Sequence, residues 1–194
     1  MTSVSRGTFP KLDAYVAMLE SEALEQNLVS KSTLDDVWTR HIQDSAQLLD
    51  LGRKGSWVDI GSGAGLPGVV LAILTQAPVT LIEPRTLRID FLQRVKEELN
   101  LDNLTIVKGK AEGAQGRYDN ITARAVANLD KLLGMTRHLS HSGTRWVLPK
   151  GENAKVELES AQKSWQGRFD LVSSQTHPGA SIVIAEGVRS RGRA

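Results

Sequence analysis

The chain has 194 residues, with 24 lysines and arginines against 22 aspartates and glutamates, and a net charge of +2. This length allows one sizeable hydrophobic core but not two full domains, and no apolar run approaches the roughly 18 residues that cross a bilayer. The absence of cysteine excludes disulfides and thiolate chemistry, so we expect a globular protein of the reducing cytoplasm with no membrane partner.

Two amphipathic helices are predicted first along the chain. Apolar residues keep helical spacing from Pro10 to about Leu28, and they do so again from Leu34 to Leu49, after the segment SKST. These helices precede the segment LGRKGS, where the apolar pattern changes. We therefore expect an N-terminal helical cap over residues 1–55 and a second unit over 56–194, packed together as one compact body.

The second helix carries a polar cluster on its inner face. On a helical wheel, His41 and Ser45 fall at the centre of the apolar face, four residues apart and able to bond each other. Arg40 and Asp44 flank them as an i, i+4 ion pair. The cluster fits either a face over a substrate pocket or an ordinary buried histidine beside a surface ion pair.

Residues 56–194 alternate between short β-type runs and helical runs. The β-type runs are 57–60, 79–83, 104–107, 120–123 and 145–149, and the helical runs are 66–75, 87–99, 128–139 and 153–165. Such alternation predicts a parallel sheet covered by helices on both faces. Two last runs, 169–174 and 181–186, have no helix between them, so we expect a hairpin with an antiparallel last strand. The fold class is α/β and Rossmann-like, with a seven-stranded, mostly parallel sheet.

A glycine-rich loop joins the first predicted strand to the next helix. In the segment VDIGSGAGLPG, Asp59 precedes four glycines, which are Gly61, Gly63, Gly65 and Gly68. Glycine permits positive φ and close backbone approach, and the helix starting near Leu66 offers unpaired N–H groups. The loop is therefore predicted to be a preformed cradle for a ligand.

The identity of that ligand is open between two nucleotides. Residues 63–68 satisfy G-x-G-x-x-G, the signature of dinucleotide sites, and Glu83 at the end of the next strand suits a ribose in NAD or in an adenosyl cofactor. Asp59 favours S-adenosylmethionine, because a carboxylate can meet the charged methionine end of that cofactor. A dinucleotide backbone gives no comparable reason for an anion there.

Four segments together carry a family resemblance. With RHIQDS, VDIGSGAGLPG, KAE and ARAV, the chain resembles the glucose-inhibited division protein B family, the small-subunit ribosomal RNA methyltransferase G enzymes, from about Asn27 to Gly151. The resemblance implies methyl transfer from S-adenosylmethionine to guanine N7 at one site in the decoding-region loop of 16S ribosomal RNA. Its implied partner is 16S RNA or the 30S subunit, not DNA, and we expect a monomer. An NAD-dependent oxidoreductase and an RNA-binding protein without turnover are the rival classes.

The resemblance also implies roles for single residues. The implied cofactor-binding positions are Asp59, Gly61, Gly63, Leu66, Glu83, Pro84, Arg85, Ala111, Glu112 and Arg124. Among them, the turn led by Glu83 lies at the ribose, Ala111 follows the strand beside the adenine, and Arg124 lies beside the methionine moiety. In three places the chain departs from the usual family pattern, at Glu83, Leu87 and Lys110.

Catalysis and RNA binding are assigned to fewer residues. Because guanine N7 has an in-plane lone pair, no general base is required, and we expect Arg124 and His41 to act by positioning. Arg40, Lys150, Arg189 and Arg191 are the expected RNA contacts, and Arg193 extends the basic tail. The other histidines, His138, His141 and His177, show neither metal-ligand spacing nor a triad, so we expect no metal and assign them no role.

Overall fold

The computed structural model of the chain describes residues 8–25 and 36–192. The predicted helix boundaries at Leu28 and Leu34, the segment SKST and the tail residue Arg193 lie outside the described residues. In the described part of the chain, no helix combines the length and apolar character needed to cross a membrane.

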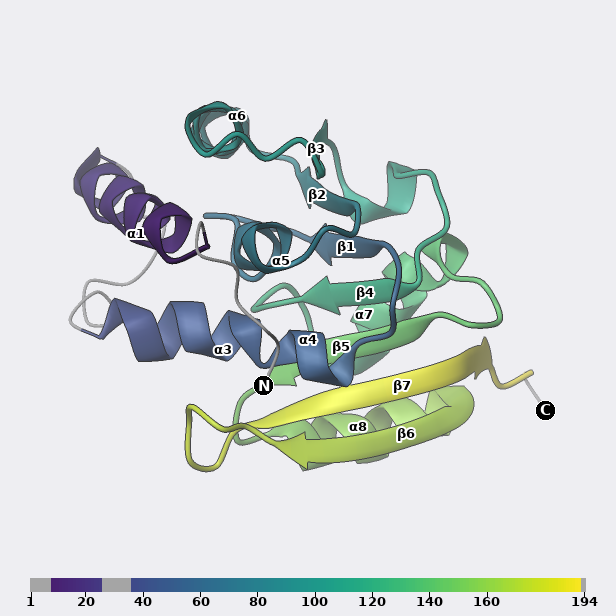
Figure 1. Cartoon of the computed structure of the whole chain (residues 1–194). Coiled ribbons are helices and arrows are strands. Elements are labelled where there is room, and N and C mark those ends of the chain that lie inside the picture. Colours follow the sequence, from purple (N-terminus) through teal and green to yellow (C-terminus); the bar gives the residue numbers. More distant parts are fainter. Residues whose placement is uncertain (1–7, 26–35, 193–194) are drawn as a thin grey trace.

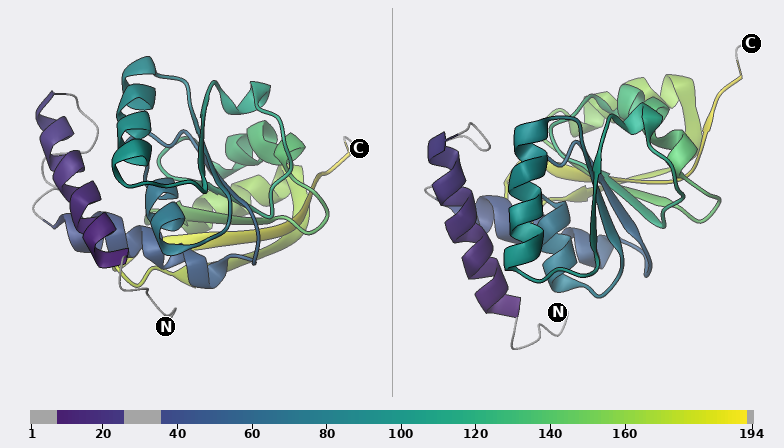
Figure 2. Two further views of the ribbon diagram at one scale, coloured as in Figure 1. Left: turned by 45° about the horizontal axis from the view of Figure 1, so that its top comes forward. Right: turned by 90° about the horizontal axis from the view of Figure 1, so that it is seen from above.

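The N-terminal helices pack on one side of the molecule (Figures 1 and 2). Helix α1, Thr8–Glu25, lies against the helices that follow the first two strands, and it buries Leu12, Tyr15 and Leu19. The second predicted helix is a run of three pieces, of which the first has π geometry: η1 at Trp38–Gln43, α3 at Asp44–Ala46 and α4 at Leu48–Leu51. His41 and Ser45 are buried, as the helical spacing predicts.

Seven strands form one sheet in the order β3-β2-β1-β4-β5-β7-β6. The strands are β1 at Trp57–Ile60, β2 at Val79–Glu83, β3 at Leu104–Lys108, β4 at Asn120–Ala123, β5 at Arg145–Lys150, β6 at Trp165–Ser173 and β7 at Ser181–Ser190. Strand β7 is antiparallel to both of its neighbours, and the pairs among β1 to β5 are parallel. The predicted Rossmann-like, mostly parallel sheet with an antiparallel last strand is therefore confirmed.

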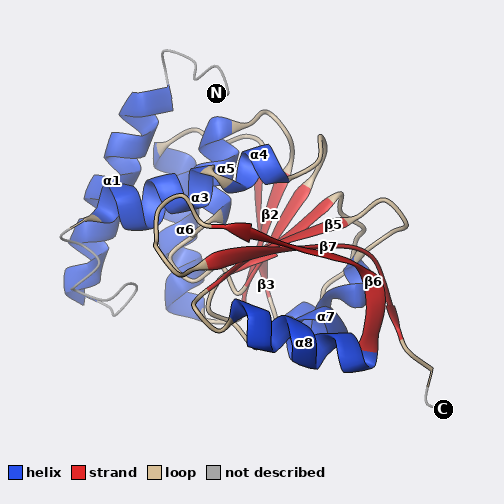
Figure 3. Cartoon of the chain, turned by 90° about the horizontal axis from the view of Figure 1, so that it is seen from below, coloured by secondary structure: helices blue, strands red, loops and turns tan. Residues whose placement is uncertain are grey.

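Helices cover both faces of the sheet (Figure 3). They are α5 at Gly68–Leu74, α6 at Thr86–Glu98, α7 at Leu129–Thr136 and α8 at Ala154–Ser164, with short 3-10 turns η2 at Ala111–Gly113 and η3 at Arg137–Leu139. One core lies under α1, α5 and α6, and a second lies under α7 and α8. The N-terminal helices thus share a core with the sheet, because burying their apolar faces requires it.

The order of the strands places a crevice at the end of β1. Strand β1 lies between β2 and β4, so the chain leaves it toward β2 on one side and returns through β4 on the other. In open α/β sheets, ligands bind outside the carboxyl ends of the strands at such a reversal of strand order. The glycine loop and Arg124 follow β1 and β4 at this point.

Candidate functional site

The glycine loop runs between β1 and α5 under close packing that requires glycine. Gly61 has a φ of +65°, and a Cβ there would lie 2.8 Å from a methyl group of Val126. At Gly68 a Cβ would collide with the Leu81 side chain and lie 2.8 Å from the Asp59 carboxylate. A side chain at either position would displace the loop or the groups beneath it.

The backbone N–H groups of the four glycines of the loop, and those of Ser62 and Leu66, are bonded within the protein. Gly61 and Ser62 donate to the Ile82 carbonyl, and Gly65 and Leu66 donate to the Ser62 carbonyl, over 2.7–3.2 Å. Further N–H groups of the loop donate to the Glu83 and Asp59 carboxylates. A site for a pyrophosphate needs N–H groups that point at the ligand. The four glycine N–H groups of the loop already donate to acceptors within the protein, and this disfavours the dinucleotide alternative.

Glu83 braces this loop from the end of β2. Its two carboxylate oxygens accept from the backbone N–H groups of Gly63, at 2.9 Å, and Arg85, at 3.0 Å. Arg88 lies 3.7 Å from the same carboxylate. Each carboxylate oxygen can accept a second hydrogen bond, so Glu83 keeps acceptor capacity for a ribose while it holds the loop.

One buried carboxylate oxygen of Asp59 lacks a hydrogen bond among the described residues. One oxygen accepts from the Gly68 N–H at 3.0 Å, whereas Oδ1 has no hydrogen-bond partner in the described structure. The Thr122 hydroxyl, at the paired position of the adjacent strand β4, is also buried and unpartnered. Buried polar atoms of proteins are nearly always hydrogen-bonded. The orphan carboxylate oxygen of Asp59 at the switch point therefore marks a place for a polar ligand group.

Burial also changes the protonation of Asp59. Desolvation raises its pKa from 3.8 to about 7, although the Gly68 N–H and the positive charge of Arg124 act in the opposite direction. A carboxyl group poised in this way ionises readily when a cation arrives. An ammonium group at Oδ1 would supply both the missing donor and the missing counter-charge.

Tyr15 connects the N-terminal cap to the loop, and the sequence patterns did not single it out. Its hydroxyl is fully buried and donates to the Ala64 carbonyl at 2.8 Å. Burial raises the pKa of this phenol far above its ordinary range, so the group remains a donor. Helix α1 thereby holds the middle of the glycine loop in place.

We expect Tyr15→Phe to loosen the loop without unfolding the protein. Loss of one buried hydrogen bond costs about 1 kcal/mol of the free energy of unfolding, and a displaced loop should weaken S-adenosylmethionine binding roughly fivefold. Calorimetry and thermal unfolding measure the two effects. Tyr118→Phe is the matched control, because its hydroxyl makes a longer, exposed bond to the Gln115 carbonyl at 3.3 Å, away from the loop. Equal cofactor affinity of both variants and the wild type would refute the role of Tyr15.

A cavity of about 590 Å³ lies beside the loop, at the carboxyl ends of β4 and β5. Residues from η1, the β4–α7 connection, the end of β5 and the β6–β7 hairpin line it, and they include Arg40, His41, Asp44, Arg124, Val126, Lys150 and His177. Val126 both lines the cavity and contacts Gly61, so the cavity adjoins the glycine loop. Among the described residues, the glycines of the loop lie outside the lining.

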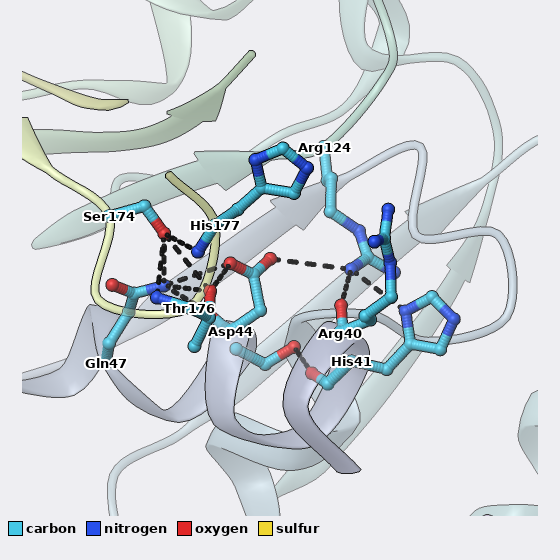
Figure 4. Close-up of polar contacts among 9 residues, drawn as sticks. Arg40, His41, Asp44, Gln47, Arg124, Ser174, Thr176 and His177 are labelled. Atoms are coloured by element: carbon cyan, nitrogen blue, oxygen red, sulfur yellow. Dashed lines mark hydrogen bonds and ion pairs between the residues drawn. The ribbon is translucent and has the colours of Figure 1, made fainter. Parts of the chain in front are cut away.

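Arg124 occupies the centre of the polar side of this cavity (Figure 4). Its guanidinium lies 3.3 Å from His41 Nδ1 and 3.7 Å from the Asp44 carboxylate. Because a guanidinium only donates, Nδ1 of His41 must be the acceptor, which fixes the neutral tautomer. Burial first, and then the charge of Arg124, lowers the pKa of His41 to about 4. His41 is therefore neutral at physiological pH.

Asp44 attaches the tip of the β6–β7 hairpin to the N-terminal helix (Figure 4). Its carboxylate accepts from the Thr176 hydroxyl at 2.7 Å and from the Gln47 amide at 2.9 Å. Gln47 in turn accepts from the backbone N–H of Gln175 at 2.9 Å. These contacts join residues about 130 positions apart. The hairpin tip becomes a wall of the cavity and brings His177 to it.

One sequence expectation about this region is wrong. Asp44 pairs with Arg124 and the hairpin tip instead of forming the expected ion pair with Arg40, and Arg40 is exposed. The expected bond between Ser45 and His41 is present, from the Ser45 hydroxyl to the backbone carbonyl of His41. His177, to which the sequence assigned no role, lines the cavity.

Two expected RNA contacts are engaged within the protein. Lys150 lines the cavity, but its side chain is 9% exposed, and its ammonium bonds the Glu157 carboxylate at 2.9 Å and the Ala127 carbonyl at 2.7 Å. Arg191 donates to the Gln162 and Trp165 carbonyls. Lys150 is therefore not available to a phosphate without giving up these bonds, whereas Arg191 uses only its Nε–H and keeps its terminal NH2 groups, which are exposed.

The remaining predicted cofactor positions lie at the ends of β2 and β3. Pro84 and Arg85 are exposed just after β2, and Ala111 is buried in η2 with Glu112 exposed beside it. Ala111 packs in the same apolar cluster as Ile60 and Ile82. The sheet thus brings the loop, the Glu83 turn and Ala111 to one edge, as the order of strands requires.

Comparisons with known proteins agree with this geometry. A family profile described as rRNA small subunit methyltransferase G matches residues 8–179. The ribosomal RNA small subunit methyltransferase G of Zymomonas mobilis is 46% identical over 94% of this chain and 87% of its own length. The enzyme of the same name from Rhizorhabdus wittichii is 45% identical over 98% of this chain and 90% of its own.

Solved structures support the fold class. A SAM-dependent methyltransferase from Aquifex aeolicus matches with a TM-score of 0.62 and 14% identity, over 78% of this chain and 93% of the other. M. jannaschii TYW2 in complex with AdoMet matches with a TM-score of 0.57 and 15% identity, over 78% and 76%. At such low identity these likenesses establish the fold alone.

Proposed function

The chain belongs to the rRNA small subunit methyltransferase G family, and from this premise we propose that it methylates N7 of a guanine in 16S ribosomal RNA with S-adenosylmethionine as cofactor. The observation that carries the choice of cofactor is the unpartnered Oδ1 of Asp59, buried at the switch point of the sheet. It suits a ligand with a cationic end. A loop whose glycine N–H groups are already bonded suits a ligand without phosphate.

The residues present fit this cofactor. Asp59 would hold the ammonium of its methionine part, and Arg124 would face the carboxylate of that part. Glu83 would accept from the ribose hydroxyls, with Pro84, Arg85 and Glu112 around the nucleoside. Ala111 would pack on the adenine, and the backbone at Gly61, Gly63 and Leu66 would pass beneath the cofactor without a side chain at the glycines. When bound, S-adenosylmethionine supplies an electrophilic methyl group on a positively charged sulfur.

The cavity beside the loop is the proposed guanine site. Guanine N7 has a lone pair and no proton, so no residue has to act as a base, and the work is positioning. The neutral His41 adds no positive charge where the guanine ring becomes cationic, and Asp44 places a carboxylate at the same wall. Arg124, fixed between them, orients the reactants.

RNA contacts at this cavity are assigned to exposed cations. Arg40 lines the cavity and is exposed, so we infer that it meets a phosphate beside the target guanine. Lys150 would do so only after leaving Glu157. The protein is proposed to act as a monomer in the cytoplasm, with the RNA free or within the 30S subunit.

Methyl incorporation into undermethylated 30S subunits tests the proposal. With labelled S-adenosylmethionine, we expect the label at the N7 position of one guanine of 16S RNA, located by strand cleavage at 7-methylguanine. Label found only on protein or small molecules would contradict the assignment, and binding of NADH without binding of S-adenosylmethionine would favour an oxidoreductase. RNA binding without any label would favour the class without turnover.

A further inference from the structure

A second cavity, of about 830 Å³, lies at the other end of the sheet. It is lined by three arginines, Arg117, Arg137 and Arg189, by two histidines, and by serines and glycines over the edge of Trp146. Among its lining residues none is acidic. A cavity with this lining has a positive potential, because its walls focus the field of several cations.

The two cavities are joined by the same strands. Strand β7 begins with Ser181 and Ile182 in the first cavity and reaches Gly187 to Arg189 in the second. About five residues of extended strand separate them, or roughly 17 Å at 3.3 Å per residue. In Figure 1, β7 runs from the hairpin tip near α3 toward the C-terminal end of the chain. The second cavity is therefore distinct from the proposed methyl-transfer site.

Some of the basic side chains that line this cavity have partners within the protein, and others form no ion pair in the described part of the chain. The guanidinium of Arg117 donates to the Ser140 carbonyl, and His141 pairs with Asp119 at 3.2 Å. In contrast, Arg137 and Arg189 are exposed, and neither forms an ion pair among the described residues. Two arginines without a carboxylate partner among the described residues thus line one hollow. A guanidinium binds phosphate through two parallel hydrogen bonds, which makes phosphate the ligand chemistry that fits.

We propose that the second cavity binds phosphodiester groups of the RNA substrate, so that the protein holds the RNA at both ends of its sheet. This inference rests on the proposed function, since it takes the substrate to be ribosomal RNA. It explains how a chain with a net charge of only +2 binds a polyanion. Two exposed arginines without an ion pair in the described structure lie together at this second anchoring point, which carries affinity but does not touch the reacting base.

The test is the salt dependence of RNA binding by the full chain. The double variant Arg137→Ala/Arg189→Ala removes both free cations and leaves Arg117 in its structural bond. The affinity for 16S RNA transcribed in vitro is measured at several KCl concentrations. The logarithm of the association constant falls linearly with log [salt], and each lost phosphate contact makes this negative slope less steep by about one. We expect the magnitude of the slope to decrease by about two in the double variant. We expect its dissociation constant near physiological salt to rise roughly tenfold.

Matched controls separate this site from a general loss of charge. Lys155→Ala/Lys163→Ala removes two exposed cations of α8 that line neither cavity, and it should leave the slope within about half a unit. Calorimetry with S-adenosylmethionine should give the wild-type affinity for both double variants. With 30S subunits, the arginine variant should raise KM for RNA and keep kcat. An unchanged slope, or an equal change in both double variants, would overturn the proposal.

The outcomes also distinguish this proposal from the proposed function. If RNA binding weakens as expected but no variant and no wild-type protein transfers methyl, the second cavity stands and the methyltransferase proposal fails. If methyl transfer is normal and the RNA slope does not move, the second cavity fails alone. Free phosphate is the other source of the same chemistry. Thermal stabilisation by inorganic phosphate that the arginine variant loses, with unchanged RNA affinity, would also overturn the RNA assignment.

Discussion

Replacing Arg124 by alanine is expected to lower kcat/KM for methyl transfer to 30S subunits by at least about 100-fold. This is the size of effect seen when one preorganised donor is removed from a reaction site. The structure places this guanidinium against His41, Asp44 and the Arg40 carbonyl together. Its loss removes the positive charge that faces the proposed methionine carboxylate, so cofactor affinity should also fall, by roughly tenfold.

The fold should survive this change. Arg124 is 23% exposed and its contacts to His41 and Asp44 are 3.3 and 3.7 Å, whereas Asp44 keeps its bonds to Thr176 and Gln47. Thermal unfolding should therefore change little. The pKa of His41 should rise from about 4, because the Arg124 charge lowers it, but burial should keep it below its ordinary value. An NMR titration of His41 reports this shift independently of activity.

Arg124→Lys provides the conservative comparison. Lysine keeps the charge and loses the planar fork, so it should recover part of the cofactor affinity and less of kcat. If the alanine variant transfers methyl at the wild-type rate while His41 titrates higher, Arg124 acts on the histidine alone and its assigned role is wrong. If the alanine and lysine variants both lose thermal stability in parallel with their loss of activity, Arg124 has a structural role instead.

The sequence predicts the architecture because short β-type and helical runs of residues alternate along the chain. Strands β1, β2 and β4 are buried along their whole length, so they lack a strict alternation and read as short β-type runs with only a few polar residues among the apolar ones. The exception is the C-terminal hairpin, where β6 begins at Trp165 instead of near Phe169. That strand is at the edge of the sheet and largely exposed, and the residues after Trp165 are polar or glycine up to Arg168, so its pattern is weak.

The site is less visible in sequence because its contacts are non-local. The partner of Asp44 could not be read from spacing: the i, i+4 rule points to Arg40, while the actual partners come from β4 and the hairpin tip. The loop glycines look like a phosphate cradle, since a pattern does not show that Ile82, Ser62 and two carboxylates already occupy their N–H groups. In the sequence, Asp59 and the family resemblance favour S-adenosylmethionine, and the three-dimensional arrangement adds that the glycine N–H groups are already bonded.

Replacing Asp59 by asparagine is expected to weaken S-adenosylmethionine binding by about 100-fold at pH 8, or about 2.7 kcal/mol. The substitution keeps the shape and an oxygen for the Gly68 N–H, but it removes the negative charge and turns the orphan acceptor into a donor. An ammonium group would then meet a donor instead of a carboxylate. Calorimetry measures the affinity directly.

The same variant should be more stable than the wild type without cofactor at high pH. The pKa of Asp59 is raised from 3.8 to about 7 in the folded protein. As the pH rises from about 4 to 7, the unfolded chain has released this proton and the folded chain still holds it. The free energy of unfolding of the wild type therefore falls, by at most about 1.4 kcal/mol per pH unit, and levels above pH 7. Asparagine has no such dependence, so the variant should match the wild type near pH 4 and exceed it at pH 8.

Cofactor binding should favour the ionised form of Asp59 in the wild type. An ammonium beside Asp59 stabilises the carboxylate, so binding below pH 7 must release a proton, and the affinity should rise with pH until about 7 and then level. Titrations in buffers of different ionisation enthalpy detect that proton. Thr122→Val is the control in the adjacent strand, because it removes an uncharged orphan hydroxyl and should change the affinity less than about threefold. A variant that loses stability and cofactor affinity together, or a wild type that binds without proton release at pH 6, would show that Asp59 supports the loop but does not meet the cofactor.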